Sequence, residues 1–316
     1  MKVTHCVIPI AGLGTRMFPA SYMIPKALFP VLDKDHRTRP LIHVLMSQAR
    51  KAGIEAIGLV LQPAQVAILQ SYFLKDPPAE FSPHGCFSEE FDEIRDLGRR
   101  IEWIIQDTPA GFGDAVYQAK SFVGCDPFLV LLGDHLFQGI DETSCIEQIL
   151  RAFDVRKHSI IGCSWVDLEE LERIAAVEIQ REMVTQDWIE GTILPVAKVD
   201  EKPGFSWSTD RQKFRLSGDR ALGAFGMDVF SKDLFPILED LSLHSDNDGK
   251  EIQLRDAQNC LARTSRLSAL VMAGNHYDLG KPELYAMNLA VLAGYDPRRS
   301  DSWRPYGGEL YGKTDS

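Results

Sequence analysis

Short apolar runs of strand length alternate with longer stretches of helical periodicity through the first half of the chain. Runs rich in Val, Ile and Leu are typical of buried parallel strands, and apolar residues spaced three or four apart indicate amphipathic helices. The predicted strands are 3–10, 54–62, 101–106 and 127–132, and the predicted helices are 40–52, 64–73 and 113–122. This alternation predicts an α/β fold with βαβ units, in which a Rossmann-like mixed, mostly parallel sheet carries helices on both faces.

The pattern changes after about residue 159, where strand-like runs follow one another with few helices between them. The predicted strands are 159–166, 175–180, 191–200 and 221–230, followed by a helix over 232–241. We expect this part to complete the sheet and to add a smaller antiparallel lobe over a pocket. Segments 204–218 and 244–250 are rich in Gly, Ser and charged residues, which predicts surface loops.

Composition and charge are those of a soluble protein without a basic surface. Of the 316 residues, 45% are hydrophobic and 25% are charged, and the formal net charge is -11. Such a chain offers no field that attracts nucleic acid or a membrane surface, and no apolar run reaches the roughly 20 residues that span a bilayer. The six cysteines include no C-x-x-C pair and the amino terminus lacks a secretory pattern. We therefore expect reduced thiols and a cytoplasmic protein.

The first predicted strand ends in a glycine-containing turn, AGLGTR at residues 11–16, and Lys26 follows soon after. Glycines at this point let backbone N–H groups approach an anion. Arg16 can clamp a phosphate with two hydrogen bonds, and Lys26 adds a mobile point charge. Taken alone, a Gly-x-Gly turn is more typical of a tight strand–helix connection. It is neither a dinucleotide-binding fingerprint, because Met17 replaces the third glycine, nor a P-loop, which needs Gly-Lys-Ser/Thr.

A longer block around this turn carries a family resemblance. The sequences AGLGTRMFPA at 11–20, IPK at 24–26 and LFPV at 28–31 closely resemble the opening of bacterial-type UTP–glucose-1-phosphate uridylyltransferases, within the sugar nucleotidyltransferase superfamily. Relatives that use dTTP or ATP have Gly-Gly in place of Ala-Gly. Further blocks follow in the family's order to about residue 295: Gln106 with GFG at 111–113, LGD at 132–134, EKP at 201–203, EIQLRDA at 251–257 and YDLG at 277–280.

The resemblance implies a nucleotide-diphospho-sugar transferase fold and a reaction. A uridylyl group would pass from UTP to glucose-1-phosphate, giving UDP-glucose and pyrophosphate. It also implies a magnesium ion (Mg2+) held by Asp134 and Asp278, since this hard cation prefers oxygen ligands. One domain would span 1–295, with a nucleotide-binding half over 1–140, a sugar-binding half over 141–295 and a mobile tail over 296–316. We also expect a homo-oligomer.

The resemblance assigns the remaining site residues to three tasks. The catalytic cations are Arg16, Lys26 and Lys202. The nucleotide-binding residues are Ala11, Gly12, Leu13, Gly14, Gln106 and Gly111. The sugar-binding residues are Glu201, Ala175 and Gly226. The block 251–257 is expected to act structurally and not to contact substrate.

Several departures from the family pattern fall on base and sugar recognition. Ala27 stands where close members carry Glu, Asp114 replaces a His, and Ile174-Ala175 replaces Tyr-Gly. A charged insertion occupies 35–39. The phosphate and metal residues are intact. The same reaction with another nucleotide or sugar-1-phosphate, such as dTTP, therefore stays open, as does a non-catalytic paralogue that binds sugar nucleotides.

Overall fold

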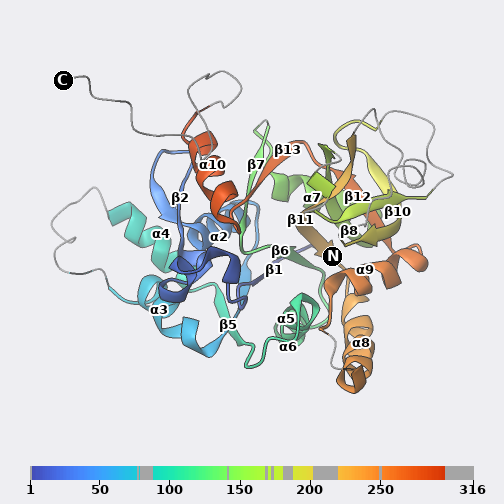
Figure 1. The fold of residues 1–316 in the computed structure, drawn as a ribbon, viewed down its shortest axis with the longest axis horizontal. Coiled ribbons are helices and arrows are strands. Elements are labelled where there is room, and N and C mark those ends of the chain that lie inside the picture. Colours follow the sequence, from blue (N-terminus) through green and yellow to red (C-terminus); the bar gives the residue numbers. More distant parts are fainter. Residues whose placement is uncertain are drawn as a thin grey trace, which may run out of the picture.

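The computed structural model describes residues 2–76, 78, 88–140, 142–167, 170–171, 174–180, 188–201, 220–248 and 251–295. Within these residues a nine-stranded sheet runs through the molecule in the order β5-β4-β1-β6-β11-β8-β12-β10-β9 (Figure 1). Its strands are β1 (His5–Pro9), β4 (Ala56–Leu61), β5 (Ile101–Ile105), β6 (Phe128–Leu131), β8 (Ser159–Asp167), β9 (Ala176–Ile179), β10 (Ile193–Asp200), β11 (Arg220–Phe230) and β12 (Leu267–Val271). The tail predicted over 296–316 and the loop predicted over 204–218 lie outside the described residues.

The strand pairings are parallel in one part of the sheet and mixed in the other. β1 pairs in parallel with β4 and β6, and β4 pairs in parallel with β5. β11 runs antiparallel to β6 and β8, and β8 pairs in parallel with β12. β10 is antiparallel to both β12 and β9. The predicted mixed α/β sheet is confirmed, with its antiparallel strands concentrated in the second half of the chain.

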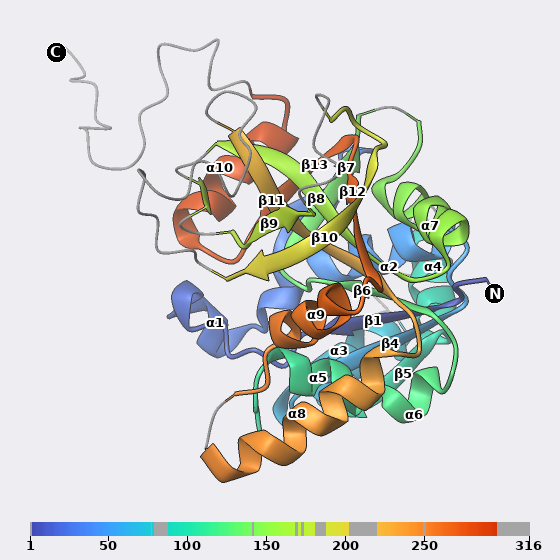
Figure 2. The ribbon, with the colours of Figure 1, turned by 90° about the vertical axis from the view of Figure 1, so that its right-hand side faces the viewer.

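Helices cover both faces of this sheet (Figure 2). One face carries α2 (Leu41–Lys51), α3 (Pro63–Phe73), α4 (Ser88–Gly98) and α7 (Cys145–Arg156). The other carries α5 (Phe112–Gln118), α6 (Lys120–Val123), α8 (Leu234–Asp248) and α9 (Leu254–Arg263). Because side chains alternate along a strand, Cys6 and Ile8 of β1 pack in the first apolar cluster and Val7 packs in the second. Burial of both faces is the main force that stabilises the three layers.

The remaining short elements connect the strands. After β1 come the single-turn helices η1 (Thr15–Met17), α1 (Ala20–Met23) and η2 (Lys26–Leu28). β2 (Pro30–Leu32) pairs with β3 (Thr38–Pro40), β7 (His135–Gly139) pairs with β13 (Gly274–Asp278), and α10 (Pro282–Leu292) follows β13. Among the helices in the described part of the chain, none has the length and apolar character to cross a membrane.

Two helix boundaries differ from the sequence predictions. The helix predicted over 113–122 divides into α5 and α6. The loop predicted over 244–250 is wrong as far as residue 248, because α8 continues to Asp248. The early turns of α8 bury Leu234 and Leu238. Once such a nucleus exists, each further residue adds a helical hydrogen bond without needing burial of its own.

An irregularity in β11 lies beside the end of the neighbouring strand β6. Its register against β8 shifts between Ala224 and Asp228, and Gly226 lies in this interval with φ +83°. A Cβ atom at Gly226 would lie 2.5 Å from Cδ1 of Leu132, so only glycine fits there. The carbonyl oxygen of Gly226 accepts a hydrogen bond from the N–H of Leu132 at 3.0 Å. The shift thereby fixes the position of Leu132 at the end of β6.

β11 also buries an acidic side chain beyond this shift. Asp228 is 5% exposed, and its Oδ2 accepts a hydrogen bond from Nε2 of Gln258 at 2.8 Å. Its Oδ1 has no partner among the described residues. Burial raises the pKa of Asp228 to about 6, and this effect outweighs the opposing influence of Arg255 and of the hydrogen bonds to the carboxyl group. The buried carboxyl group therefore costs stability once the unfolded chain is ionised.

Replacing Asp228 with Asn should stabilise the protein more at pH 7 than at pH 4. An unfolded Asp ionises near pH 4, whereas folded Asp228 keeps its proton up to about pH 6. The free energy of unfolding of the wild type therefore falls as the pH rises through this window. Two pKa units correspond to at most about 3 kcal/mol.

Chemical unfolding of the wild type and of Asp228→Asn at both pH values measures this difference. Asp92→Asn, at an exposed position of α4, is the matched control and should show no such pH dependence. An Asp228→Asn effect of equal size at both pH values would contradict the raised pKa.

Candidate active site

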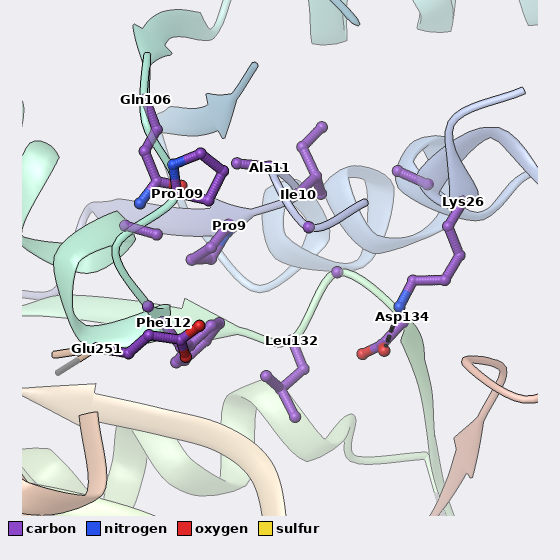
Figure 3. A pocket seen from close by; sticks show the side chains of 15 residues that line it. Pro9, Ile10, Ala11, Lys26, Gln106, Pro109, Phe112, Leu132, Asp134 and Glu251 are labelled. Atoms are coloured by element: carbon purple, nitrogen blue, oxygen red, sulfur yellow. Dashed lines mark hydrogen bonds and ion pairs between the residues drawn. The ribbon is translucent and has the colours of Figure 1, made fainter. Parts of the chain in front are cut away.

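A pocket of about 300 Å³ opens at the edge of the sheet where β1 and β6 end (Figure 3). Ligands of open α/β sheets bind at this carboxyl edge. The residues that line it are Pro9, Ile10, Ala11, Gly12, Lys26, Ala27, Gln106, Pro109, Gly111, Phe112, Ala115, Leu132, Gly133, Asp134 and Glu251. Six residues predicted for the site thus lie together: Ala11, Gly12, Lys26, Gln106, Gly111 and Asp134.

The turn after β1 forms one wall of the pocket. A Cβ atom at Gly12 would meet nothing within 4 Å, so open space adjoins the backbone there. Gly14 has φ +63° at the start of η1, where the chain turns. Leu13 is 67% exposed and Arg16 is also exposed, and neither lines the pocket. The structure therefore brings Ala11 and Gly12 to the pocket and leaves the side chains of Leu13 and Arg16 at the surface.

Lys26 enters the pocket from η2 and meets the end of β6 (Figure 3). Its Nζ lies 2.6 Å from Oδ2 of Asp134. Both side chains keep about a quarter of their surface exposed, 22% for Lys26 and 24% for Asp134. A lysine ammonium that is accessible and held beside a carboxylate can also neutralise a bound phosphate.

Two strand ends that are distant in sequence bring Asp134 and Asp278 together. His135, the first residue of β7, pairs with Asp278, the last residue of β13. The N–H of Leu279 donates to the carbonyl oxygen of Asp134 at 2.9 Å, and the N–H of Gly280 donates to Oδ1 of Asp278 at 2.7 Å. One possible ligand atom from each of Asp134, His135 and Asp278 lies within 4.8 Å of the other two. Carboxylate oxygens in this arrangement suit a hard divalent cation.

Neighbouring charges keep Asp134 ionised at this partly buried position. Burial alone would raise the pKa of its carboxyl group, but His135 and Lys26 together hold that pKa well below its usual range. In turn Asp134 and Asp278 raise the pKa of His135 against the effect of its burial. Nδ1 of His135 lies 2.8 Å from Oδ1 of Asp134. The group therefore presents an anionic oxygen at neutral pH, and His135 is a member that the sequence analysis did not include.

The opposite end of the pocket is built by the loop after β5 and the start of α5. The backbone N–H of Gln106 donates to the carbonyl oxygen of Leu61 at 2.9 Å. Its buried side chain donates from Nε2 to Oδ2 of Asp114 at 2.5 Å. Gly111 has φ +109°, and a Cβ atom there would lie 2.5 Å from the carbonyl oxygen of Ile252. This close approach requires glycine and leaves the backbone at residue 111 bordering the pocket.

Two backbone hydrogen bonds join this loop to the segment before α9, and we call them the Ile252 clasp. The N–H of Ile252 donates to the carbonyl oxygen of Ala110 at 2.8 Å, and the N–H of Gly113 donates to the carbonyl oxygen of Ile252 at 2.8 Å. The clasp places Glu251 in the pocket wall (Figure 3). The expectation that 251–257 acts structurally did not place Glu251 at the pocket, where the structure puts it. No local pattern marks this residue, because its place depends on the approach of two distant segments.

Three residues predicted to bind the sugar lie on or beside the antiparallel strands. Oε2 of Glu201, just after β10, accepts a hydrogen bond from Nε of Arg255 at 3.2 Å. Ala175 is buried in the apolar cluster beside α8 and α9. Gly226 contributes through the shift in β11 described above. Of these three, none lines the pocket formed by the described residues, and Lys202 lies outside those residues.

Comparison with known proteins gives a family match along most of the chain. A family profile described as "Nucleotidyl transferase" matches residues 6–290. The UTP–glucose-1-phosphate uridylyltransferase of Bacillus subtilis (strain 168) is 30% identical over 308 residues, which cover 96% of each chain. A second protein of that strain, the UTP–glucose-1-phosphate uridylyltransferase YngB, is 29% identical over 283 residues, which cover 88% of this chain and 86% of the relative.

Solved structures show the same likeness. A structure described as UTP-bound UGPase from Acinetobacter baumannii has a TM-score of 0.73 and 27% identity, and the match covers 94% of this chain and 95% of that one. A structure of apo UDP-glucose pyrophosphorylase has a TM-score of 0.76 and 25% identity, with coverage of 92% and 98%. These structures share the mixed sheet with its flanking helices.

Replacing Gly280 with Ala should disturb the paired carboxylates. A Cβ atom there would lie 2.7 Å from Oδ2 of Asp134 and 3.0 Å from Oδ1 of Asp278, so at least one oxygen must move. Displacing the groups that orient metal ligands typically weakens metal binding by about 10- to 100-fold. Titration with Mn²⁺, followed by electron paramagnetic resonance, should show a loss in this range while the melting temperature changes little. Unchanged Mn²⁺ affinity would show that the pair does not hold a cation.

Proposed function

Because this chain belongs to the nucleotidyl transferase family, we propose that it transfers the uridylyl group of UTP to glucose-1-phosphate, giving UDP-glucose and pyrophosphate. The two Bacillus subtilis relatives are named for this activity, and one similar structure is described as UTP-bound. The observation that carries the proposal is the pocket, which has hydrogen-bonding groups at one end and the side chains of Lys26 and Asp134 at the other. The carboxylate of Asp278 lies next to that of Asp134.

The two ends of the pocket match the two ends of a nucleoside triphosphate. Gln106 and the backbone at Gly111 can pair with the edge of a pyrimidine, because an amide offers both a donor and an acceptor. Ala11 and Gly12, with Leu13 and Gly14 beyond them, can direct backbone N–H groups to the phosphates. We assign the reacting phosphate to the end of the pocket that Lys26 and Asp134 line.

The reaction requires little covalent chemistry from the protein. An oxygen of the sugar phosphate attacks the α-phosphorus of UTP, and the bond from this phosphorus to the oxygen that bridges to the β-phosphate breaks. Pyrophosphate leaves with that oxygen. Both reactants are anions, so the protein has to align them and to neutralise the charge that develops. No nucleophile from the protein is needed.

Cations supply this neutralisation. We assign Lys26 and Arg16 to the triphosphate and Lys202 to the sugar phosphate. The cluster of Asp134, His135 and Asp278 fits a magnesium ion (Mg2+), which the two carboxylates would hold. When bound, the ion would act as a Lewis acid and withdraw charge from the reacting phosphates.

The sugar is assigned to the antiparallel side of the sheet. We propose that Glu201 accepts hydrogen bonds from the sugar hydroxyl groups, since matched polar groups discriminate hexoses well. Arg255 holds the Glu201 carboxylate in place. Ala175 and Gly226 would shape this side through the backbone, because Ala175 directs its methyl group into the apolar cluster. A cytoplasmic location and a homo-oligomer remain predictions from the sequence.

Release of pyrophosphate tests the proposal directly. The purified protein is given each of UTP, dTTP, CTP and ATP with each of several sugar-1-phosphates in the presence of Mg²⁺. We expect UTP with glucose-1-phosphate to give the highest kcat/KM. A higher kcat/KM for another pair would identify that pair as the substrates. Release of pyrophosphate from no pair would favour a non-catalytic sugar-nucleotide-binding protein.

Removing either carboxylate should nearly abolish turnover without unfolding the protein. Asp134→Asn and Asp278→Asn keep the shape of the side chain but weaken its attraction for a cation. We expect kcat to fall by at least about 100-fold, measured at saturating Mg²⁺. Asp92→Asn, at an exposed position of α4, is the matched control. Near-normal kcat in either site variant would remove that residue from the metal site.

Arg16 and Lys202 should act on different substrates. A hydrogen bond to a charged group contributes about 1.5–3 kcal/mol, which corresponds to roughly 10- to 100-fold in affinity. We expect Arg16→Ala to raise mainly the KM for UTP and Lys202→Ala to raise mainly the KM for glucose-1-phosphate. Lys198→Ala removes an exposed lysine that is paired with Asp200 and serves as the control for Lys202. Equal effects of both variants on both KM values would contradict the separate assignments.

A further inference from the structure

The carboxylate of Asp114 lies beside the part of the pocket assigned to the base, and neither the reaction nor the metal site uses it. Asp114 is 8% exposed. Its Oδ2 accepts a hydrogen bond from Nε2 of Gln106 at 2.5 Å, and its Oδ1 accepts one from Nε2 of Gln118 at 3.0 Å. We propose that Asp114 holds the amide of Gln106 in one orientation and thereby selects a pyrimidine that carries a hydrogen on N3 over cytosine. This inference rests on the proposed function, since it names the base that the same pocket admits.

The orientation follows from the chemistry of the carboxylate. The two ends of a side-chain amide have nearly the same shape, so the amide of Gln106 could in principle point either end at a neighbour. An ionised carboxylate accepts hydrogen bonds and donates none. Asp114 therefore pairs with the nitrogen of Gln106 and turns the oxygen away. Figure 3 shows this oxygen on the side of Ala11 and the nitrogen on the opposite side.

Both partners are fixed, so the orientation is maintained. The backbone N–H of Gln106 donates to the carbonyl oxygen of Leu61, and the residue is 3% exposed. Asp114 lies in the first turn of α5, where Gln118 one turn later holds its second oxygen. The Ile252 clasp joins the start of α5 to the segment before α9. Neither side chain can turn without breaking hydrogen bonds in a buried place, which is costly.

A fixed acceptor distinguishes the pyrimidines at a single atom. In uracil and thymine, N3 carries a hydrogen that can donate to Oε1 of Gln106, and the second N–H of Gln106 can donate to a neighbouring carbonyl oxygen of the base. In cytosine, N3 carries a lone pair instead, which would face that same Oε1. The unfavourable contact cannot be relieved by an amide flip, because the flip would place Oε1 of Gln106 against the carboxylate of Asp114. Sites with fixed hydrogen-bonding groups reject mismatched ligands in this way.

Binding of UTP and of CTP tests the role of Asp114 without requiring turnover. Asp114→Asn keeps the size of the side chain but can donate as well as accept, so it no longer dictates the orientation of Gln106. Isothermal titration calorimetry of each nucleotide should show that the Kd ratio of CTP to UTP falls by about tenfold or more in Asp114→Asn. In Gln118→Leu, which removes only the second hydrogen bond to Asp114, the ratio should stay close to that of the wild type.

A double-mutant cycle shows whether Asp114 acts through Gln106. In the background of Gln106→Ala, the further change Asp114→Asn should leave the Kd ratio unchanged. A purely structural role for Asp114 would weaken UTP and CTP equally and would do so in either background. Asp114→Ser, which is too short to reach Gln106, repeats the measurement if Asp114→Asn does not fold.

The outcomes of these binding experiments do not depend on whether the protein catalyses uridylyl transfer. An unchanged Kd ratio in Asp114→Asn or in Asp114→Ser, or a wild type that binds CTP as tightly as UTP, overturns the role of Asp114. A wild type that prefers UTP and loses this preference in Asp114→Asn supports it, whether or not pyrophosphate is released with glucose-1-phosphate. Failure of the uridylyl transfer is thus visible only in the pyrophosphate assay.

Discussion

Two carboxylates that repel each other have to stand side by side at the edge of this sheet. Asp134 and Asp278 are held there by the β7–β13 pairing and by the hydrogen bond from the N–H of Leu279 to the carbonyl oxygen of Asp134. Lys26 and His135 offset the concentration of negative charge. Gly280 leaves the two carboxylates the space they share. The roles proposed for Lys26 and for the metal ion depend on the position of this pair.

The two ends of the pocket are organised by different kinds of force. At the end of the pocket proposed to bind the phosphates, positive and negative side chains compensate one another. A charged ligand can take the place of either partner. At the base end, Gln106 and Asp114 are nearly buried and joined by a short hydrogen bond. Such a bond is directional, so it can distinguish ligands of equal charge and similar size. We therefore assign the charged groups to the reaction and the directional hydrogen bond between Gln106 and Asp114 to the selection of the base.

Local patterns in the sequence were sufficient for the strands and for bringing four of the predicted site residues to one pocket. Ala11, Gly12, Lys26 and Asp134 each belong to a short motif at the end of an apolar run, where topology alone brings them to one edge. Glu251 and the contact between Gln106 and Asp114 could not be anticipated in this way. Both depend on how distant segments approach each other, and no periodicity in one segment records the position of another.

The Ile252 clasp has a consequence for how the molecule is made. The base end of the pocket consists of the loop at Ala110–Gly113 and of a segment that is synthesised much later. While the chain is still on the ribosome, the early strands can form and pair, but the loop lacks the backbone partners that give it shape. This wall of the pocket therefore takes its folded shape only after the segment around Ile252 has left the exit tunnel. A chain that has not yet reached Ile252 lacks both the partner of Ala110 and the Glu251 side of this wall.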